Sequence, residues 1–166
     1  MIEIFPSPIL RQIAKKVDNF GTPELNKLIT NMFNIMAKKN GAGLAAPQIG
    51  VSQRVFVYGF DKNPRYPNEP PVPKDYVINP EIIWSSKEKV GLEEGCLSFP
   101  GLRLNVLRSK SIVFSTFDLD GNRHEKEAIG FVARIVQHEN DHLNGVLFPD
   151  IAENSPDILK LKFSGA

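Results

Sequence analysis

The chain contains few residues of the two types that bind transition metals through sulfur or ring nitrogen. Among 166 residues there are one cysteine and three histidines. A single cysteine cannot form an internal disulfide, so a disulfide-stabilised scaffold is excluded. Because a free thiol persists best under reducing conditions, we expect the protein to be cytoplasmic.

Other absences narrow the class of protein. No run of 18 apolar residues occurs, so no membrane-spanning helix is expected. The formal net charge is +1, and no broad basic surface for nucleic acid is therefore indicated. The first residues, 1–6, lack the basic and long apolar parts of a signal peptide. A content of 42% hydrophobic and 23% charged residues is typical of a globular protein, and we expect one domain over residues 1–166.

Two helix-start signals lie in the first quarter of the chain. Ser7-Pro8 predicts a short helix over 9–14, and Thr22-Pro23 predicts a longer one. The longer one carries apolar residues at helical spacing and ends at Asn40-Gly41. These apolar residues are expected to form core.

Strand-like runs follow at 54–58, 76–79, 81–84 and 111–119. Asp120-Gly121 predicts a hairpin turn into a further strand over 122–128. Five prolines fall within 61–74, so this segment is predicted to be an extended surface loop and neither a central strand nor a helix. His124 follows the turn among charged residues and is expected to lie on the surface.

The most informative stretch is His138-Glu139-Asn140-Asp141-His142. Positions i and i+4 share one face of a helix, so both rings can bind one metal ion. Glu139 then lies beside the metal as a general base. A helix end whose polar residues merely face water is the alternative.

Cys96 provides a third possible ligand. It follows Glu94 and Gly95, a setting that favours an accessible turn or strand end over a buried core position. Two histidines and one thiolate leave a fourth coordination position for water, as in catalytic zinc sites, whereas structural zinc sites are usually closed by four protein ligands.

A small, glycine-rich segment ends in an amide side chain at Gln48. Its residues, 41–48, allow close approach of a bound chain, and Gln48 can donate a hydrogen bond to a carbonyl oxygen. Taken alone, this segment also fits a linker or a helix exit.

Together these three segments resemble the signature segments of the peptide deformylases: Gly-x-Gly-Leu-Ala-Ala-x-Gln at 41–48, Glu-Gly-Cys-Leu-Ser at 94–98 and Gln-His-Glu-x-Asp-His-Leu at 137–143. Similarity extends to 8–11, 78–80 and 145–148, so it covers nearly the whole chain. The resemblance implies an α+β fold, with antiparallel β-sheets around a central helix that carries the histidine motif.

The resemblance also implies an activity, the hydrolysis of the N-formyl group from formyl-methionine on newly made polypeptides. Cys96, His138 and His142 would hold one divalent metal, implied to be Fe²⁺ in the cell, with Zn²⁺, Ni²⁺ or Co²⁺ possible in purified protein because the ligand types do not separate them. Glu139 would move the proton.

Further roles come from the same resemblance. The Gln48 amide and the Leu97 backbone N–H would stabilise the oxyanion, and the Gly43 backbone would align the substrate as an added strand. The methionine side chain needs an apolar pocket, for which the candidates by position are Leu44, Leu97, Ile135 and the aliphatic part of Arg103; ordinary core or surface packing is the alternative for each. Glu94 and Arg108 match positions that pair in the family.

Nascent formyl-methionine polypeptides are the expected partners, and the ribosome near its exit tunnel is a further candidate. Some family members have a longer basic C-terminal helix that is implicated in ribosome docking. Here residues 158–163 predict only a short amphipathic turn or strand, so that mode of contact is not expected.

Two other functions remain open. The histidine motif also marks the zincin metallopeptidases, which usually take a third ligand C-terminal to the helix, but no histidine follows His142. A non-enzymatic metal- or peptide-binding module is the second, although Gln48, Cys96 and Glu139 are all present.

Overall fold

The structure is a computed structural model, and it describes residues 1–153. Its elements in chain order are η1 (Pro8–Arg11), α1 (Pro23–Lys38), β1 (Gly43–Ala45), η2 (Ala46–Ile49), β2 (Val55–Phe60), β3 (Val72–Ile78), β4 (Glu81–Ser85), β5 (Lys89–Cys96), β6 (Phe99–Ser109), β7 (Ser111–Phe117), β8 (Arg123–Ile129), α2 (Phe131–Leu143) and α3 (Phe148–Ile151). The fold is thus a small mixed α/β arrangement.

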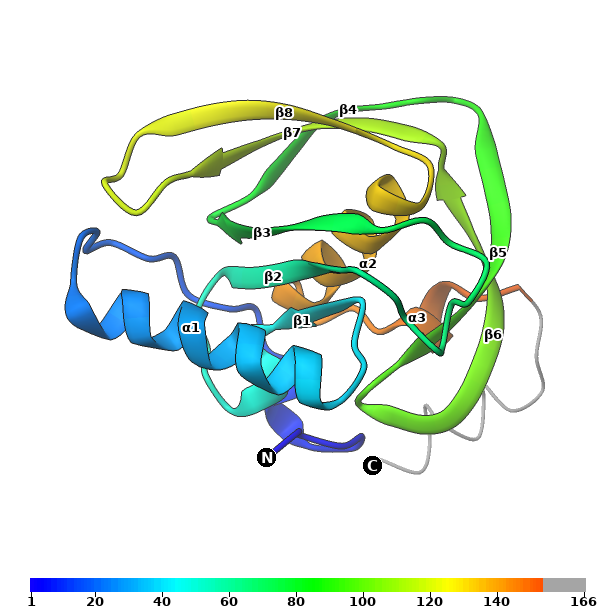
Figure 1. Ribbon diagram of the computed structural model, residues 1–166, viewed down its shortest axis with the longest axis horizontal. Helices are drawn as coiled ribbons and strands as arrows, with labels where there is room; N and C mark the ends of the chain where they lie inside the picture. The colour runs from blue at the N-terminus through cyan, green and yellow to red at the C-terminus, as the bar shows by residue number, and fades with distance from the viewer. Residues whose placement is uncertain (154–166) are drawn as a thin grey trace.

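The strands form three antiparallel groups, with strand orders β1-β2-β3, β4-β7-β8 and β5-β6. The last is a long two-stranded ribbon, which bends around one side of the molecule (Figure 1). Helix α2 lies behind the β1-β2-β3 sheet in Figure 1 and contacts β1, β2, β6 and β8. The antiparallel sheets predicted from the sequence are confirmed.

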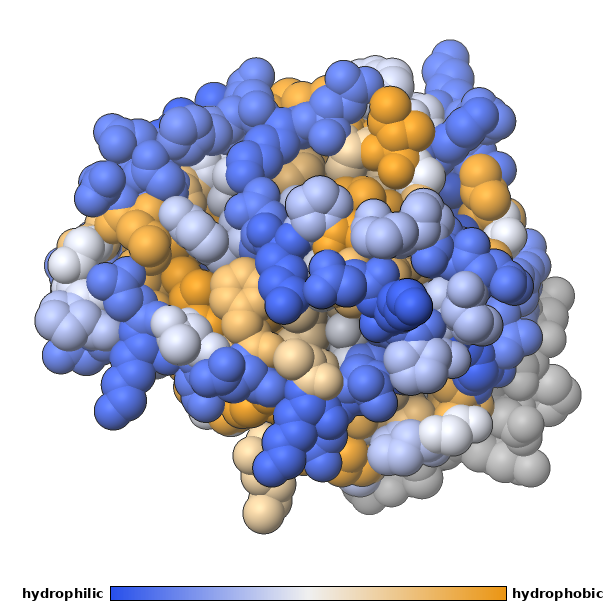
Figure 2. All heavy atoms as spheres, viewed as in Figure 1, coloured by the Kyte–Doolittle hydropathy of each residue, from blue (hydrophilic) through white to orange (hydrophobic). Residues whose placement is uncertain are grey.

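Helix α1 forms where the sequence predicts it. The Thr22 side chain accepts a hydrogen bond from the Leu25 backbone N–H, and Pro23 occupies the first turn, so both start signals act as expected. One face of α1 is buried and packs on β1 and β2 in a common apolar cluster; the buried residues of that face are Leu25, Ile29, Met32 and Met36. Figure 2 shows mainly hydrophilic residues on the outer face of the molecule in this view.

Helix α2 is buried along much of its length. Ala133, Val136 and Leu143 belong to an apolar cluster with residues of β2, β7 and β8. The motif residues Glu139 and His142 are also buried, which places polar groups inside the protein where each must find a partner. No helix among residues 1–153 is long and apolar enough to cross a membrane.

Several predicted boundaries are wrong. The 61–74 segment was predicted to be a loop throughout, but β3 begins within it at Val72 and includes Pro73. β3 pairs only with β2 and is an edge strand, so a residue without an N–H is tolerated there. The first helix is shorter than predicted, a 3-10 helix over Pro8–Arg11.

The short strand β1 and the ribbon β5-β6 were not predicted as strands. The turn and strand predictions around Asp120-Gly121 are confirmed by the β7-β8 pairing. The prediction for 158–163 concerns residues outside the described part of the chain.

Candidate active site

Cys96, His138 and His142 converge although they come from two elements. Cys96 is the last residue of β5, and both histidines lie on α2. One potential ligand atom from each of the three lies within 4.8 Å of the others, and Cys96 Sγ is 3.4 Å from His142 Nε2. Ligands of a tetrahedral metal at bond lengths of about 2.0–2.3 Å are separated by about 3.4–3.8 Å. The donor set and its spacing therefore fit a single metal ion.

Cys96 was expected at an accessible turn or strand end. It does end a strand, but it is only 6% exposed. The thiol faces the interior because β5 terminates against α2, where the Sγ atom also accepts a hydrogen bond of 3.5 Å from Gln48 Nε2. Burial of the sulfur is compatible with a metal ligand, and Cys96 lines the cavity described below.

The two histidines have different electrostatic settings. Burial lowers the pKa of His142 well below its ordinary value, and the positive charge of His138 acts in the same direction. Burial would lower the pKa of His138 too, but hydrogen bonds with Cys96 and Glu94 outweigh it and raise that pKa. His138 Nδ1 lies 2.8 Å from Glu94 Oε1, which leaves its Nε2 as the nitrogen that can bind a metal.

Glu139 lies beside the three ligands and is 4% exposed. Burial raises the pKa of its carboxyl group to about 7. Its Oε2 atom has no hydrogen-bond partner among residues 1–153. A buried carboxylate oxygen without a partner costs free energy unless a ligand satisfies it, so this atom is available to a bound water or substrate.

Gly43 of β1 is pressed against Glu139. A Cβ atom added at Gly43 would lie 2.6 Å from Glu139 Oε1, closer than such contacts allow. Any larger residue here would force the Glu139 side chain to shift, because the strand backbone and the carboxylate lie so close together.

Gln48 of η2 is 1% exposed and is held at both ends of its amide. Its Oε1 accepts a hydrogen bond of 2.9 Å from the Ala45 backbone N–H, and its Nε2 donates one of 3.1 Å to Ser98 Oγ. The remaining Nε2 hydrogen has only the long contact with the Cys96 sulfur, a weak acceptor, and can turn to an oxygen atom placed beside that sulfur.

Glu94 connects the ligands to the surrounding strands. Its carboxylate accepts hydrogen bonds from Arg108 of β6 at 2.9 and 3.0 Å and from Arg134 of α2 at 2.6 Å. Burial would raise the pKa of Glu94, but its hydrogen bonds with His138 and Arg108 outweigh that effect and lower the pKa far below its ordinary value. The expected Glu94–Arg108 pair is therefore present, and it is buried.

A cavity adjoins the three ligands. Gly43, Gln48, Leu97, Ile135 and Glu139 line it, together with Tyr66 and Phe131. Of the predicted pocket residues, Leu97 and Ile135 thus face the cavity, whereas Leu44 and Arg103 are not among its lining residues.

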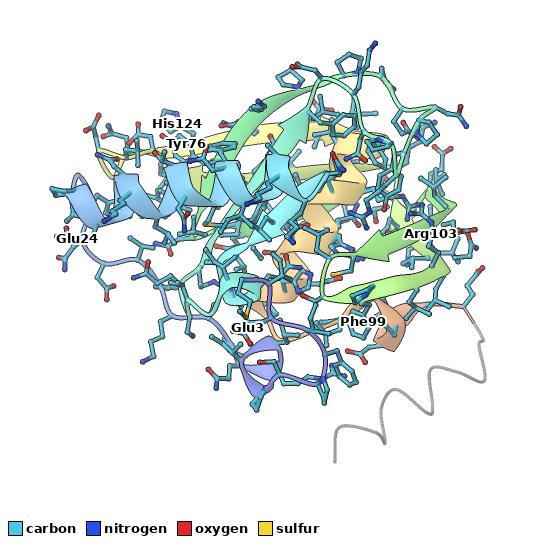
Figure 3. All side chains as sticks on the ribbon, turned by 60° about the horizontal axis from the view of Figure 1, so that its bottom comes forward. Glu3, Glu24, Tyr76, Phe99, Arg103 and His124 are labelled. Carbon is cyan, nitrogen blue, oxygen red and sulfur yellow. The ribbon has the colours of Figure 1, made fainter. Side chains whose placement is uncertain are left out.

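Leu44 is fully buried and packs with residues of α1 and β2 in another cluster. Successive residues of a strand point to opposite faces, so Gly43 facing Glu139 turns Leu44 away from the cavity. Arg103 lies further along the β5-β6 ribbon, where Figure 3 labels it, and it lines a neighbouring groove.

Comparisons with known proteins agree with this geometry. A family profile described as Polypeptide deformylase matches residues 1–156. The chain belongs to the polypeptide deformylase family. It is 50% identical over 142 residues to Peptide deformylase 1 of Bordetella pertussis, an alignment that covers 86% of this chain and 81% of that protein. It is also 50% identical over 140 residues to Peptide deformylase 2 of Ralstonia nicotianae, covering 84% and 79%.

Solved deformylase structures have the same fold. The Met-Ala-Ser-bound class I type b peptide deformylase of Acinetobacter baumannii superposes with a TM-score of 0.88 at 39% identity, over 91% of this chain and 96% of that one. The peptide deformylase of Thermotoga maritima gives a TM-score of 0.82 at 42% identity, over 93% and 97%.

Two residues at this deformylase site were missed by sequence reasoning. Arg134 belongs to the Glu94 network, and its position one helical turn before His138 was the available signal. Tyr66 reaches the cavity from the β2–β3 loop and accepts a hydrogen bond of 3.1 Å from the Gly95 backbone N–H. Nothing in the proline-rich sequence around Tyr66 indicated that contact.

Proposed function

We propose that this chain removes the N-formyl group from formyl-methionine at the start of newly synthesised polypeptides, with Glu139 as its proton carrier. The observation that carries the proposal is the convergence of Cys96, His138 and His142 within 4.8 Å, beside a buried carboxylate with an unpartnered oxygen. Family membership supplies the reaction, because family members are metal-dependent hydrolases of this amide.

The three ligand residues would hold one divalent metal, and we propose Fe²⁺ in the cell. Zn²⁺, Ni²⁺ and Co²⁺ accept the same sulfur and nitrogen donors, so purified protein can contain them. When bound, such an ion supplies Lewis acidity and lowers the pKa of water toward roughly 7.

The chemistry of the remaining steps falls to the protein side chains. Glu139 accepts the proton of the water that attacks the formyl carbon, then delivers it to the amine of methionine as the C–N bond breaks and formate leaves. Such proton transfer by a positioned group typically contributes about 10²–10⁴-fold in rate. Burial of Glu139 supports this role, because a carboxyl pKa of about 7 suits a group that both takes and gives a proton near neutral pH.

The negative charge that develops on the formyl oxygen needs donors. We assign these to the Nε2–H of Gln48 that otherwise meets only the Cys96 sulfur, and to the backbone N–H of Leu97, which lines the same cavity. The anchoring of Gln48 by Ala45 and Ser98 supports this role, because a donor fixed in advance costs no reorganisation during the reaction.

The substrate backbone would lie along Gly43, and its methionine side chain would enter the apolar part of the cavity. Leu97, Ile135 and the aromatic rings of Tyr66 and Phe131 offer apolar surface there, and aromatic rings also suit a thioether sulfur. The Acinetobacter baumannii relative was solved with Met-Ala-Ser bound, a peptide that corresponds to a deformylated product.

The wider setting follows from the same proposal. We infer that α2, with both histidines, acts as the central helix of the fold and that the protein works in the cytoplasm on chains leaving the ribosome. Direct contact with the ribosome remains a prediction.

The test compares two activities of the purified, metal-loaded protein. We expect formate release from formyl-Met-Ala-Ser and no cleavage of an unformylated internal peptide. Cleavage within the internal peptide without formate release would favour a zincin-type peptidase. Metal binding without either activity would favour the non-enzymatic module.

A further inference from the structure

A groove adjoins the catalytic cavity on the side of the β5-β6 ribbon. It encloses about 400 Å³ and shares Arg65, Gly95, Cys96 and Leu97 with the cavity. A polypeptide whose first residue occupies the cavity can therefore continue into the groove. Figure 3 shows Arg103 on the ribbon, with Phe99 closer to the N-terminal segment; both residues line the groove.

The groove is positively charged. Lys39, Arg65 and Arg103 line it, and none of its lining residues within 1–153 is Asp or Glu. Arg103 has an exposed ion pair of 2.9 Å with Glu93. Arg65 makes no hydrogen bond or ion pair through its side chain with any residue of the described chain, and its guanidinium only lies over the Tyr66 ring, 5.8 Å from its centre.

Two guanidinium groups lie close to one point of the backbone. A Cβ atom added at Gly95 would be 2.9 Å from Arg65 Nη2 and 3.2 Å from Arg103 Nη1. The Arg103 guanidinium also lies over the Tyr66 ring, 4.9 Å from its centre. Two like charges at one position repel each other, and Arg65 retains donors that suit a carboxylate.

We propose that Arg65 and Arg103 bind a side-chain carboxylate of the substrate, so that the site selects polypeptides with Asp or Glu shortly after the formyl-methionine. This inference rests on the proposed deformylase function and adds a preference for one class of substrate. The occupant is the substrate chain itself because the groove opens directly from the cavity at Cys96 and Leu97.

Arg65 comes from the proline-rich loop between β2 and β3, which runs beside the ribbon (Figure 1). Its charge also reaches the catalytic carboxyl group: burial dominates the pKa of Glu139 and raises it, and Arg65 is among the charges that oppose that rise. Replacement of Arg65 can therefore alter turnover of every substrate. For that reason the test uses ratios between matched peptides and a second variant at Arg103.

The experiment measures kcat/KM for formate release from amidated formyl-Met-Ala-Ala-Ala peptides. Asp, Asn or Lys replaces alanine at the second, third or fourth position in turn, and Asn is the uncharged control for Asp. At low salt we expect kcat/KM of the Asp peptide to exceed that of the Asn peptide roughly fivefold at one or more positions, as for an exposed charge pair. The Lys peptide should have a lower kcat/KM than the Asn peptide. The preference should shrink at high salt.

Arg65→Gln and Arg103→Gln should each bring the Asp-to-Asn ratio close to one. The matched control is Lys110→Gln, because Lys110 is exposed, pairs with Glu88 and does not line the groove. It should keep the wild-type ratio. A ratio near one at all three positions in the wild type, or a ratio retained in either arginine variant, would overturn the carboxylate site. No formate from any peptide, including the all-alanine parent, would instead refute the deformylase function.

Discussion

At the scale of single residues, the contact between Gly43 and Glu139 controls the geometry of the site. The backbone of β1 and the catalytic carboxylate are so close that a single methyl group cannot fit between them. A substrate aligned along Gly43 would therefore lie directly beside Glu139. The position of the carboxylate depends on the absence of a side chain at residue 43.

The Gly43→Ala variant tests this dependence. The added Cβ should displace Glu139 Oε1, which it would otherwise approach to 2.6 Å. A displacement of about 1 Å in a catalytic group can cost roughly 10² in rate, so we expect kcat for a formyl-methionine peptide to fall by about that factor.

Gly91→Ala is the matched control, because Gly91 is an exposed residue of β5 and a Cβ atom added there would meet its nearest atom, Asn105 Nδ2, at 3.3 Å. Thermal melts show whether each variant folds. A folded Gly43→Ala protein with kcat within a few-fold of the wild type would contradict the steric argument.

At the scale of elements, the sequence predicted helices better than strands. Helix α1 has apolar residues at helical spacing and an unambiguous cap at Thr22, so local signals determine it. The motif on α2 is equally local. The β5 strand, by contrast, contains Gly91, Gly95 and two glutamates, and no periodic apolar pattern reveals it.

The residues of the site that were not predicted are those whose contacts are long-range. Arg134 and Tyr66 depend on Glu94 and Gly95, which lie 40 and 29 residues away in the chain. Leu44 does not line the cavity for a different reason: the sequence could not show which face of β1 meets the cavity. The ligands were predictable because their types and spacing carry the chemistry.

Tyr58 connects two elements and provides a pH test. It lies on β2 opposite Asp75 of β3, to which its hydroxyl donates a hydrogen bond of 3.5 Å, and Lys126 of β8 also binds Asp75. Burial, followed by the charge of Asp75, raises the pKa of Tyr58 from 10.0 to about 12.

The pKa of Tyr58 is higher in the folded protein than in the unfolded chain. The protonated Tyr58 therefore contributes to the stability of the folded state; this contribution is fully present below pH 10 and is lost as the pH rises through 12. Absorbance of tyrosinate should show a titration step near pH 12, and Tyr58→Phe should remove that step. The absence of any step near pH 12 in the wild type, or a step unchanged in Tyr58→Phe, would contradict the buried Tyr58–Asp75 contact.

At the scale of the whole molecule, Glu94 joins the ribbon to α2. Its carboxylate contacts Arg108 on β6 and both Arg134 and His138 on α2, and Arg108 also bonds to Asp141 at 2.5 Å. Cys96 lies two residues after Glu94 on β5. The same network therefore stabilises the fold and fixes the distance between the cysteine and the histidines.

Replacement of Glu94 should affect stability and metal binding together. Glu94→Gln leaves two buried arginines without their full counter-charge, and breaking a buried ion pair costs about 3–5 kcal/mol of the free energy of unfolding. Loss of the negative charge beside His138 should lower metal affinity about 10–100-fold.

Chemical denaturation and metal titration measure the two effects. Glu93→Gln is the control, since the side chain of Glu93 is 61% exposed and its pair with Arg103 lies at the surface. That variant should change stability by less than about 1 kcal/mol. Similar losses of stability and metal affinity in both variants would contradict the role of the buried Glu94 network.

The most direct test of the whole account measures bound metal and deformylation side by side in Glu139→Gln. Cys96, His138 and His142 are unchanged in this variant, and glutamine has nearly the same shape as glutamate while it cannot carry the proton. We predict metal content equal to the wild type and a loss of about 10²–10⁴-fold or more in kcat for a formyl-methionine peptide. Parallel loss of metal and activity, or retention of both, would contradict the assignment of Glu139 as the proton carrier beside a three-ligand metal site.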